Sequence, residues 1–456
     1  MPQVNGAAGP ACRMMNDSLI GPWGWRNGTD GGQEDRYCAD GGDTVNLMAV
    51  GAVSLGLIVG AAEPAVAVLA VTPSLSVTER YTTNVFLTAE PYGDFATFVS
   101  PGALLRFHNR SLETSVSYVG RWEYYVRAPR RNRNSQMVLA DGHSRWLDRA
   151  VPGLAVRFSA AIIRTAGLPA FSVDEGVVDT SEGVSVSRLD TVRTRGSVVL
   201  DYAISKRSSI SLANSIVGTR YAQVDASRLA ADLGVPVADI AQPKNSVVRD
   251  GAATLRYEWS ARTTWSVVAS RMSRRVDPPR NQPLAPSRIV SATRVTPGFD
   301  YELTPALTVT AHAGLILIED DLLHRAGDFA VVWEGDGVGA GVDYVRRTGT
   351  GGGLTGDITV SDRARARVSR RWTLVSSTFA SLGYSRTLPA TETAVSDFQI
   401  VSYAFHVGYV TMIRKGLTAE LTYLYFDQRS EGIEVSTNRH IVGLTLSAVA
   451  PSWRVP

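Results

Sequence analysis

The chain has 456 residues, of which 44% are hydrophobic and 20% charged, with a formal net charge of +3 and only two cysteines. These figures exclude a disulfide-stapled small domain, a collagen-like chain and a strongly charged disordered chain. A single charge-free apolar segment, roughly residues 45–62, is long enough to span a membrane as a helix, so a polytopic helical membrane protein is excluded as well.

The N-terminal segment predicts export. Residues 1–44 are glycine-rich, acidic and without hydrophobic periodicity, so we expect an unstructured extension or an overlong start. Residues 45–70 are an apolar stretch that ends in small residues, a pattern typical of a signal peptide cleaved after Ala67 or Ala70. An uncleaved anchor helix is the alternative. Cleavage would remove Cys12 and Cys38 and, with them, thiol and disulfide chemistry.

Beyond residue 70 the dominant pattern is strand-like alternation of apolar and polar residues. Leu255, Tyr257 and Trp259 alternate with Arg256 and Glu258, so an extended segment there has one apolar and one polar face. The same split recurs at 112–122, 192–204, 307–315 and 417–425. Residues 71–456 therefore predict one all-β domain, an antiparallel up-and-down transmembrane β-barrel of about 16–18 strands.

The breaks between these segments come in two sizes. Short ones at 109–110, 205–207, 260–262, 303–305 and 414–416 alternate with longer ones at 128–136, 166–187, 223–246, 277–287, 319–328, 387–395 and 428–437. An outer-membrane barrel has this asymmetry, with short periplasmic turns and long extracellular loops. The glycine-rich stretch 329–371 interrupts the pattern and leaves the strand count open there.

A secreted soluble β-sandwich or a solenoid is the rival architecture. A sandwich buries an apolar face made mainly of Ile, Leu, Val and Phe, whereas this face mixes Tyr and Trp with small residues. Aromatic residues near strand ends are typical of the girdles at a membrane interface. This composition favours the membrane barrel.

The first and last strands carry a family resemblance. Residues 75–88, followed by Asp94-Phe95 and 99–102, resemble the opening hairpin of a β-barrel porin family of Gram-negative outer membranes. Its members often accompany exopolysaccharide and exosortase gene clusters. Residues 438–446 are similar to the last strand of that family. The resemblance implies an outer-membrane barrel and assigns no chemistry.

Arginines at spacing two are the strongest candidates for function. Arg363, Arg365 and Arg367 fall on one strand face, and Arg193 and Arg195 make a shorter row. That face must be the lumen, because an arginine facing lipid near the midplane costs about 2–4 kcal/mol. Such rows either attract anions or simply solvate a polar lumen, and both readings stay open. The pore-lining candidates are Arg363, Arg365, Arg367, Arg193, Arg195, Arg256 and Glu258.

Acidic residues gather in the predicted long loops. Folded inward they could oppose the arginines across a constriction; solvated loop charge is the alternative. These loop charges include Asp174, Glu175, Glu319, Asp320 and Asp321.

No motif predicts an enzyme, a metal or a cofactor. The six histidines have no metal-ligand spacing, and no hydrolase or phosphate-loop motif stands out. His312 and His406 are expected in the lumen or at an interface. We therefore expect a protein that is not an enzyme.

The sequence as a whole predicts a porin-like channel of the cell outer membrane. The channel would pass anionic solutes or export an acidic exopolysaccharide. The alternatives are a non-conducting structural or adhesive barrel and an outer-membrane hydrolase. The expected partners are outer-membrane lipid, the barrel assembly machinery, polysaccharide export components and lipopolysaccharide, but no nucleic acid. Lipopolysaccharide contacts are expected at Arg271, Arg274 and Arg275.

Overall fold

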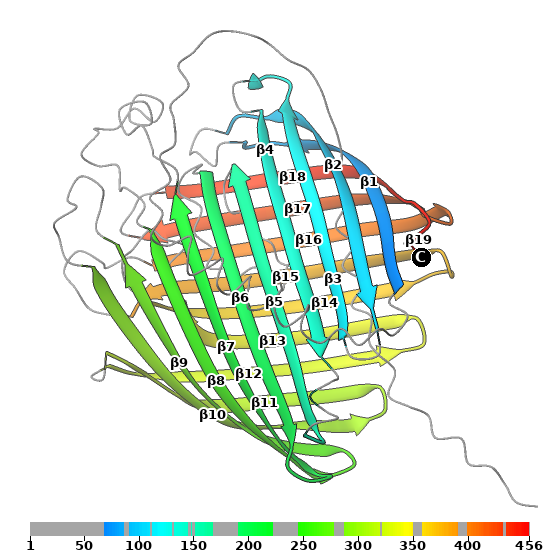
Figure 1. Ribbon diagram of the computed structural model, residues 1–456. Helices are drawn as coiled ribbons and strands as arrows, with labels where there is room; N and C mark the ends of the chain where they lie inside the picture. The colour runs from blue at the N-terminus through cyan, green and yellow to red at the C-terminus, as the bar shows by residue number, and fades with distance from the viewer. Residues whose placement is uncertain are drawn as a thin grey trace, which may run out of the picture.

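The computed structural model shows a closed antiparallel β-barrel (Figure 1). It describes residues 68–85, 91–109, 112–129, 132–144, 147, 151–166, 190–221, 245–277, 287–319, 322–349, 358–390, 399–431 and 435–455. No helix within these ranges is long and apolar enough to cross a membrane. The predicted extension and most of the predicted signal peptide lie outside the described residues.

Eighteen strands form the wall, and each pairs with its neighbours in chain order. The predicted all-β, up-and-down barrel is thereby confirmed, at the upper end of the predicted strand count. The strands are β1 (Val68–Thr82), β2 (Asp94–His108), β3 (Leu112–Tyr125), β4 (Arg133–Ser144), β5 (Leu154–Ala166), β6 (Asp190–Ala203), β7 (Ser208–Tyr221), β8 (Ser246–Ser260), β9 (Thr263–Val276), β10 (Arg288–Thr304), β11 (Leu307–Ile318), β12 (Leu322–Gly335), β13 (Val338–Gly349), β14 (Thr359–Arg371), β15 (Ser376–Pro389), β16 (Gln399–Arg414), β17 (Leu417–Glu431) and β18 (Val435–Val449).

The barrel closes where the first strand meets the last. β1 and β18 pair antiparallel from Ser74↔Val449 to Thr82↔Ile441. After a break at 450–452 the chain re-forms a short strand, β19 (Trp453–Val455), which extends the seam along β1. Closure leaves no free sheet edge, so every strand has a partner on both sides, as a bilayer interior requires.

Side chains of alternate residues along each strand point to opposite faces of the wall, so residues of even and odd position (their parity) belong to different faces. In each strand the large exposed apolar side chains share one parity, and the register aligns them on one face from strand to strand. Examples are Val342, Val368, Leu382 and Tyr403, which are 52%, 47%, 59% and 46% exposed. A single-layer barrel has no second layer to cover such residues, so this face points outward and the opposite parity faces the lumen.

One edge of the barrel has tight turns. β12 and β13 are joined through Gly337, and β16 and β17 through Gly416, both with positive φ (74° and 80°). A non-glycine residue is strained in this conformation, which is why glycine ends these hairpins. We call this the tight-turn edge, and the other the long-connection edge.

Several predicted boundaries need revision. The long loops predicted at 319–328 and 428–437 are wrong, because the connection after β11 comprises only residues 319–321 and the connection after β17 only residues 432–434. The glycine-rich stretch 329–371 is regular, since its glycines sit within the paired β12, β13 and β14 or in their turns. β1 begins at Val68, three residues before the predicted start of the barrel.

The lumen contains no large apolar core in the part of the chain that the structure describes. A small apolar cluster lies near the long-connection edge and includes Val290, Ile316 and Ile318. Elsewhere many of the buried side chains are serine and threonine, such as Ser76, Ser266 and Thr296. The interior wall is therefore polar over most of its height.

Candidate functional site

The predicted arginine ladder lies on the inner wall. On β14, Val368 marks the outward parity, so Arg363, Arg365 and Arg367 face the lumen. Their register neighbours on β15 are Ser385, Gly383 and Ser381. The inner faces of β13 and β14 also carry Arg347 and Arg371. Within these two strands, the lumen face therefore has five arginines.

Asp343 is the single lumen-facing carboxylate of β13 and β14 within the described residues. Its Oδ1 accepts a hydrogen bond from Arg365 Nε at 3.0 Å, and the two side chains are only 25% (Arg365) and 21% (Asp343) exposed. The guanidinium of Arg367 lies over Gly341, where a Cβ would stand 3.2 Å from Arg367 Nε. Five arginines against one aspartate leave a formal excess of +4 on this stretch of wall.

The second predicted row faces the same lumen from another part of the wall. Val192 and Val198 mark the outward parity of β6, which turns Arg193 and Arg195 inward. Seven strands, β7 to β13, separate β6 from β14. In an 18-strand barrel this places the two rows on nearly opposite walls, as β6 and β14 show in Figure 1.

Arg256 and Glu258 also face inward. They lie near the end of β8, where Leu255 and Tyr257 mark the outward parity, and both side chains are exposed. Arg256 pairs in register with Ser266 of β9, and Glu258 with Thr264. These two charges therefore line the lumen toward the tight-turn edge.

Of the predicted loop charges, the structure describes only Glu319. It directly follows β11 with a positive φ of 50°, and its Oε1 lies 3.8 Å from Arg288 Nη2. Asp174, Glu175, Asp320 and Asp321 lie outside the described residues. The predicted constriction therefore remains a prediction.

The three arginines predicted to contact lipopolysaccharide do not share one face. Arg271 and Arg275 have the outward parity of Trp265 and Val267. Arg274 has the opposite parity and is 1% exposed, so it faces the interior. Its predicted outer-surface contact is therefore wrong, because adjacent strand residues point to opposite faces.

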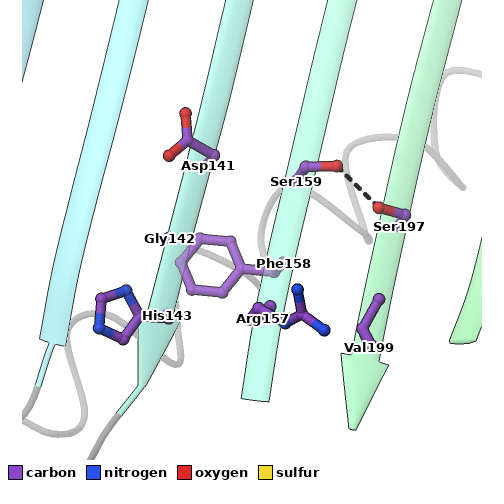
Figure 2. A pocket seen from close by; sticks show the side chains of 8 residues that line it. All are labelled: Asp141, Gly142, His143, Arg157, Phe158, Ser159, Ser197 and Val199. Carbon is purple, nitrogen blue, oxygen red and sulfur yellow. Dashed lines mark hydrogen bonds between the residues drawn. The ribbon is translucent and has the colours of Figure 1, made fainter. Parts of the chain in front are cut away.

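A shallow hollow of about 300 Å³ lies on the inner face of β4, β5 and β6 (Figure 2). Arg157 reaches across to Asp201, with Nη2 2.7 Å from Oδ2. Ser159 and Ser197 join their hydroxyl groups at 2.7 Å. Phe158 and Val199 line this hollow together with charged and hydroxyl side chains, so its surface is mixed in polarity.

A hydrogen-bonded network that the sequence did not predict crosses β9 to β12. His312 Nε2 lies 2.8 Å from Ser266 Oγ, and His312 Nδ1 lies 2.8 Å from Asp328 Oδ2. Arg294 Nη2 donates to Asp328 Oδ1 at 3.0 Å. The sequence indicated only that His312 and Asp328 fall on the lumen-facing positions of their strands.

Nothing in the described residues assembles a metal site, since no group of three His, Cys, Asp or Glu side chains comes together there. The polar groups of the inner wall are instead organised as arginine–carboxylate pairs and hydroxyl pairs. Such a wall can hold water and attract anions.

Comparison with known proteins adds no family assignment. No family model matches the chain, and no curated protein matches its sequence. Among solved structures, it resembles OccK3 (OpdO) of Pseudomonas aeruginosa, at 12% identity, covering 85% of this chain and 96% of that one, with a TM-score of 0.41.

Two further solved structures resemble the chain to a similar degree. OccK7 (OpdD) of Pseudomonas aeruginosa has 9% identity, covers 84% of this chain and 99% of that one, and gives a TM-score of 0.43. The siderophore receptor PirA of the same organism has 9% identity, covers 83% and 80%, and gives 0.42. Likenesses at this level do not carry a function from one protein to another.

Proposed function

We propose that this chain is an outer-membrane channel that lets small anionic solutes diffuse through its lumen. The observation that carries the proposal is the excess of lumen-facing arginine on β13 and β14, where five guanidinium groups stand against Asp343. Guanidinium groups bind carboxylates and phosphates through forked donors, and rings of arginine are used in pores for anions.

The location in the outer membrane is part of the same proposal. It is supported by the closed single-layer barrel, by the outward band of large apolar side chains and by aromatic residues within that band, such as Tyr344, Tyr403 and Trp333. The long-connection edge would then face the outside and the tight-turn edge the periplasm. Outward-facing Arg271 and Arg275 lie near the long-connection edge, where they would meet lipopolysaccharide phosphates.

Export of an acidic exopolysaccharide is the narrower form of this function. A polyanionic chain would be attracted to the same arginines as a small anion, since both present carboxylates. Its support is the arginine excess together with the resemblance of residues 75–88 to exopolysaccharide-associated barrels. The test is whether acidic oligosaccharides compete with small anions and so reduce the single-channel current. Such competition distinguishes polysaccharide export from passage of small anions.

Single-channel recording in planar bilayers tests the channel. The full chain should give stable conductance steps, and a salt gradient should give a reversal potential of the sign for anion selectivity. The Arg363/Arg365/Arg367→Ser variant should shift that potential toward zero. Arg370→Ser is the matched control: Arg370 belongs to the same strand, faces outward and lies 4.1 Å over the ring of Trp372. A folded barrel without conductance contradicts the proposal.

A further inference from the structure

Three side chains from three strands form a continuous relay on the inner wall. Ser266 of β9, His312 of β11 and Asp328 of β12 are joined through the two ring nitrogens of His312, at 2.8 Å on each side. The side chain of His312 is 13% exposed and Ser266 is 5% exposed, so the relay is shielded from bulk water at the wall. This is the arrangement of nucleophile, base and orienting carboxylate that activates a serine for acyl transfer.

The relay is possible because of one glycine. Gly298 on β10 is the register partner of both Ser266 and His312, and His312 is the partner of Asp328. The four residues thus form one row across β9 to β12. A Cβ at Gly298 would overlap the imidazole, so its absence lets the ring cross β10 and reach Ser266.

The hydrogen bonds also fix the proton positions on the imidazole. Nδ1 faces a carboxylate, which accepts hydrogen bonds only, so in the neutral ring Nδ1 carries the proton. Nε2 is then an acceptor for the Ser266 hydroxyl. Arg294 Nη2 donates a hydrogen bond to the other oxygen of Asp328 at 3.0 Å, which orients the carboxylate. Asp328 and Arg294 are therefore positioning residues.

Acyl transfer also needs a donor for the oxyanion. The backbone N–H groups around Ser266 belong to the sheet ladder, so a side chain must supply it. Arg256 is the register partner of Ser266 on β8, on the same lumen face, and directly opposed residues have Cβ atoms about 4.5–5.5 Å apart. Arg256 is exposed on that face, one strand from Ser266, so its guanidinium is the donor assigned to the oxygen that becomes negative.

The geometry restricts the substrate. Trp265 and Val267, on either side of Ser266, have the outward parity and are 50% and 43% exposed, so the hydroxyl lies on the face away from lipid. Lipid acyl chains therefore do not reach it. We propose that Ser266, His312 and Asp328 are a catalytic triad that hydrolyses small, water-soluble esters within the barrel lumen.

The reaction follows from these positions. Ser266 Oγ attacks the ester carbonyl carbon while its proton moves to His312 Nε2, and Arg256 binds the oxyanion. The bond from carbonyl carbon to the alcohol oxygen breaks, and His312 returns the proton to the leaving alkoxide. Water then attacks the acyl-serine with His312 as base. The acid leaves, and Ser266 recovers its proton.

Covalent labelling of the purified full chain in detergent micelles tests the triad. A fluorophosphonate probe should modify Ser266, located by mass spectrometry of the digested chain, and p-nitrophenyl acetate should be hydrolysed. Ser266→Ala should lose the label and reduce the hydrolysis rate about 100-fold or more. Absence of label on Ser266 in the unchanged protein would overturn the proposal, whatever the variants do.

Matched variants separate catalysis from structure. Ser159→Ala removes a lumen hydroxyl that is hydrogen-bonded to Ser197, and it should keep both the label and the hydrolysis rate. Asp328→Asn should reduce the labelling rate and alter its pH profile, because the amide favours the wrong tautomer of His312. Heat-modifiable gel migration shows which variants are folded. Equal hydrolysis by folded Ser266→Ala would also overturn the triad, and neither result depends on ion conductance.

Discussion

Arg365 donates a hydrogen bond from Nε to Asp343 Oδ1 at 3.0 Å across the β13–β14 pair. This contact holds Arg365, the central member of the arginine ladder, in one position and neutralises part of the ladder's charge. Arg365 and Asp343 are direct register partners, so the contact also joins the two strands on the lumen face. The net charge of the ladder can therefore be changed by a substitution at Asp343 alone.

Asp343→Asn should increase anion selectivity. The change removes the negative charge beside Arg365 without removing the hydrogen-bond acceptor, so the lumen gains one net positive charge. The reversal potential in a salt gradient should move further toward the anion value. Glu258→Gln removes a lumen carboxylate outside the ladder in the same isosteric way. Comparing the two variants tests whether the increase in anion selectivity is particular to the ladder. An unchanged potential in Asp343→Asn contradicts a conduction path along β14.

Gly298→Ala should destabilise the barrel. The added Cβ would overlap the His312 ring and the Ala311 carbonyl oxygen, and overpacking of this kind costs about 1–3 kcal/mol. Urea unfolding of the detergent-solubilised barrel measures the loss. Gly251→Ala is the control, since its Cβ would find Asn214 Nδ2 at 3.8 Å, an ordinary contact. Equal stability of the two variants would mean that His312 does not occupy the space over Gly298.

Leu382→Arg should reduce the free energy of unfolding in lipid by about 2–4 kcal/mol, the cost of an arginine facing lipid near the midplane. Leu382 is 59% exposed on the outward face of β15. Ser369→Arg, on the lumen face of neighbouring β14, adds the same charge in an exposed position and should change stability little. The reverse order of the two effects would show that the faces are assigned the wrong way round.

Deletion of residues 453–456 should slow barrel closure. β19 pairs Leu69↔Val455, Ala70↔Arg454 and Val71↔Trp453, and its loss leaves the start of β1 paired only with β2. The folded fraction during refolding into detergent, measured by heat-modifiable migration, should fall. Trp453→Ala keeps the backbone pairing and should fold like the unchanged chain. If truncation leaves the folding rate unchanged, the seam closes through β18 alone.

The sequence by itself determined the fold class and the faces. Period-two alternation distinguishes lipid-facing from lumen-facing residues in each strand, because neighbouring side chains point to opposite sides. Leu255 and Tyr257 against Arg256 and Glu258 show this on β8. The arginine ladder on β14 was predictable for the same reason, since its three members share one strand.

Only the tertiary structure decided which residues of different strands meet. Ser266 lies 46 residues from His312, and His312 lies 16 from Asp328. Their alignment depends on the register of four strands, which turn geometry and barrel closure set together. A shift of one residue in any of these strands would turn a member of the row toward lipid. Alternation alone carries no information on register, so neither this row nor the pairing of Arg365 with Asp343 could be predicted.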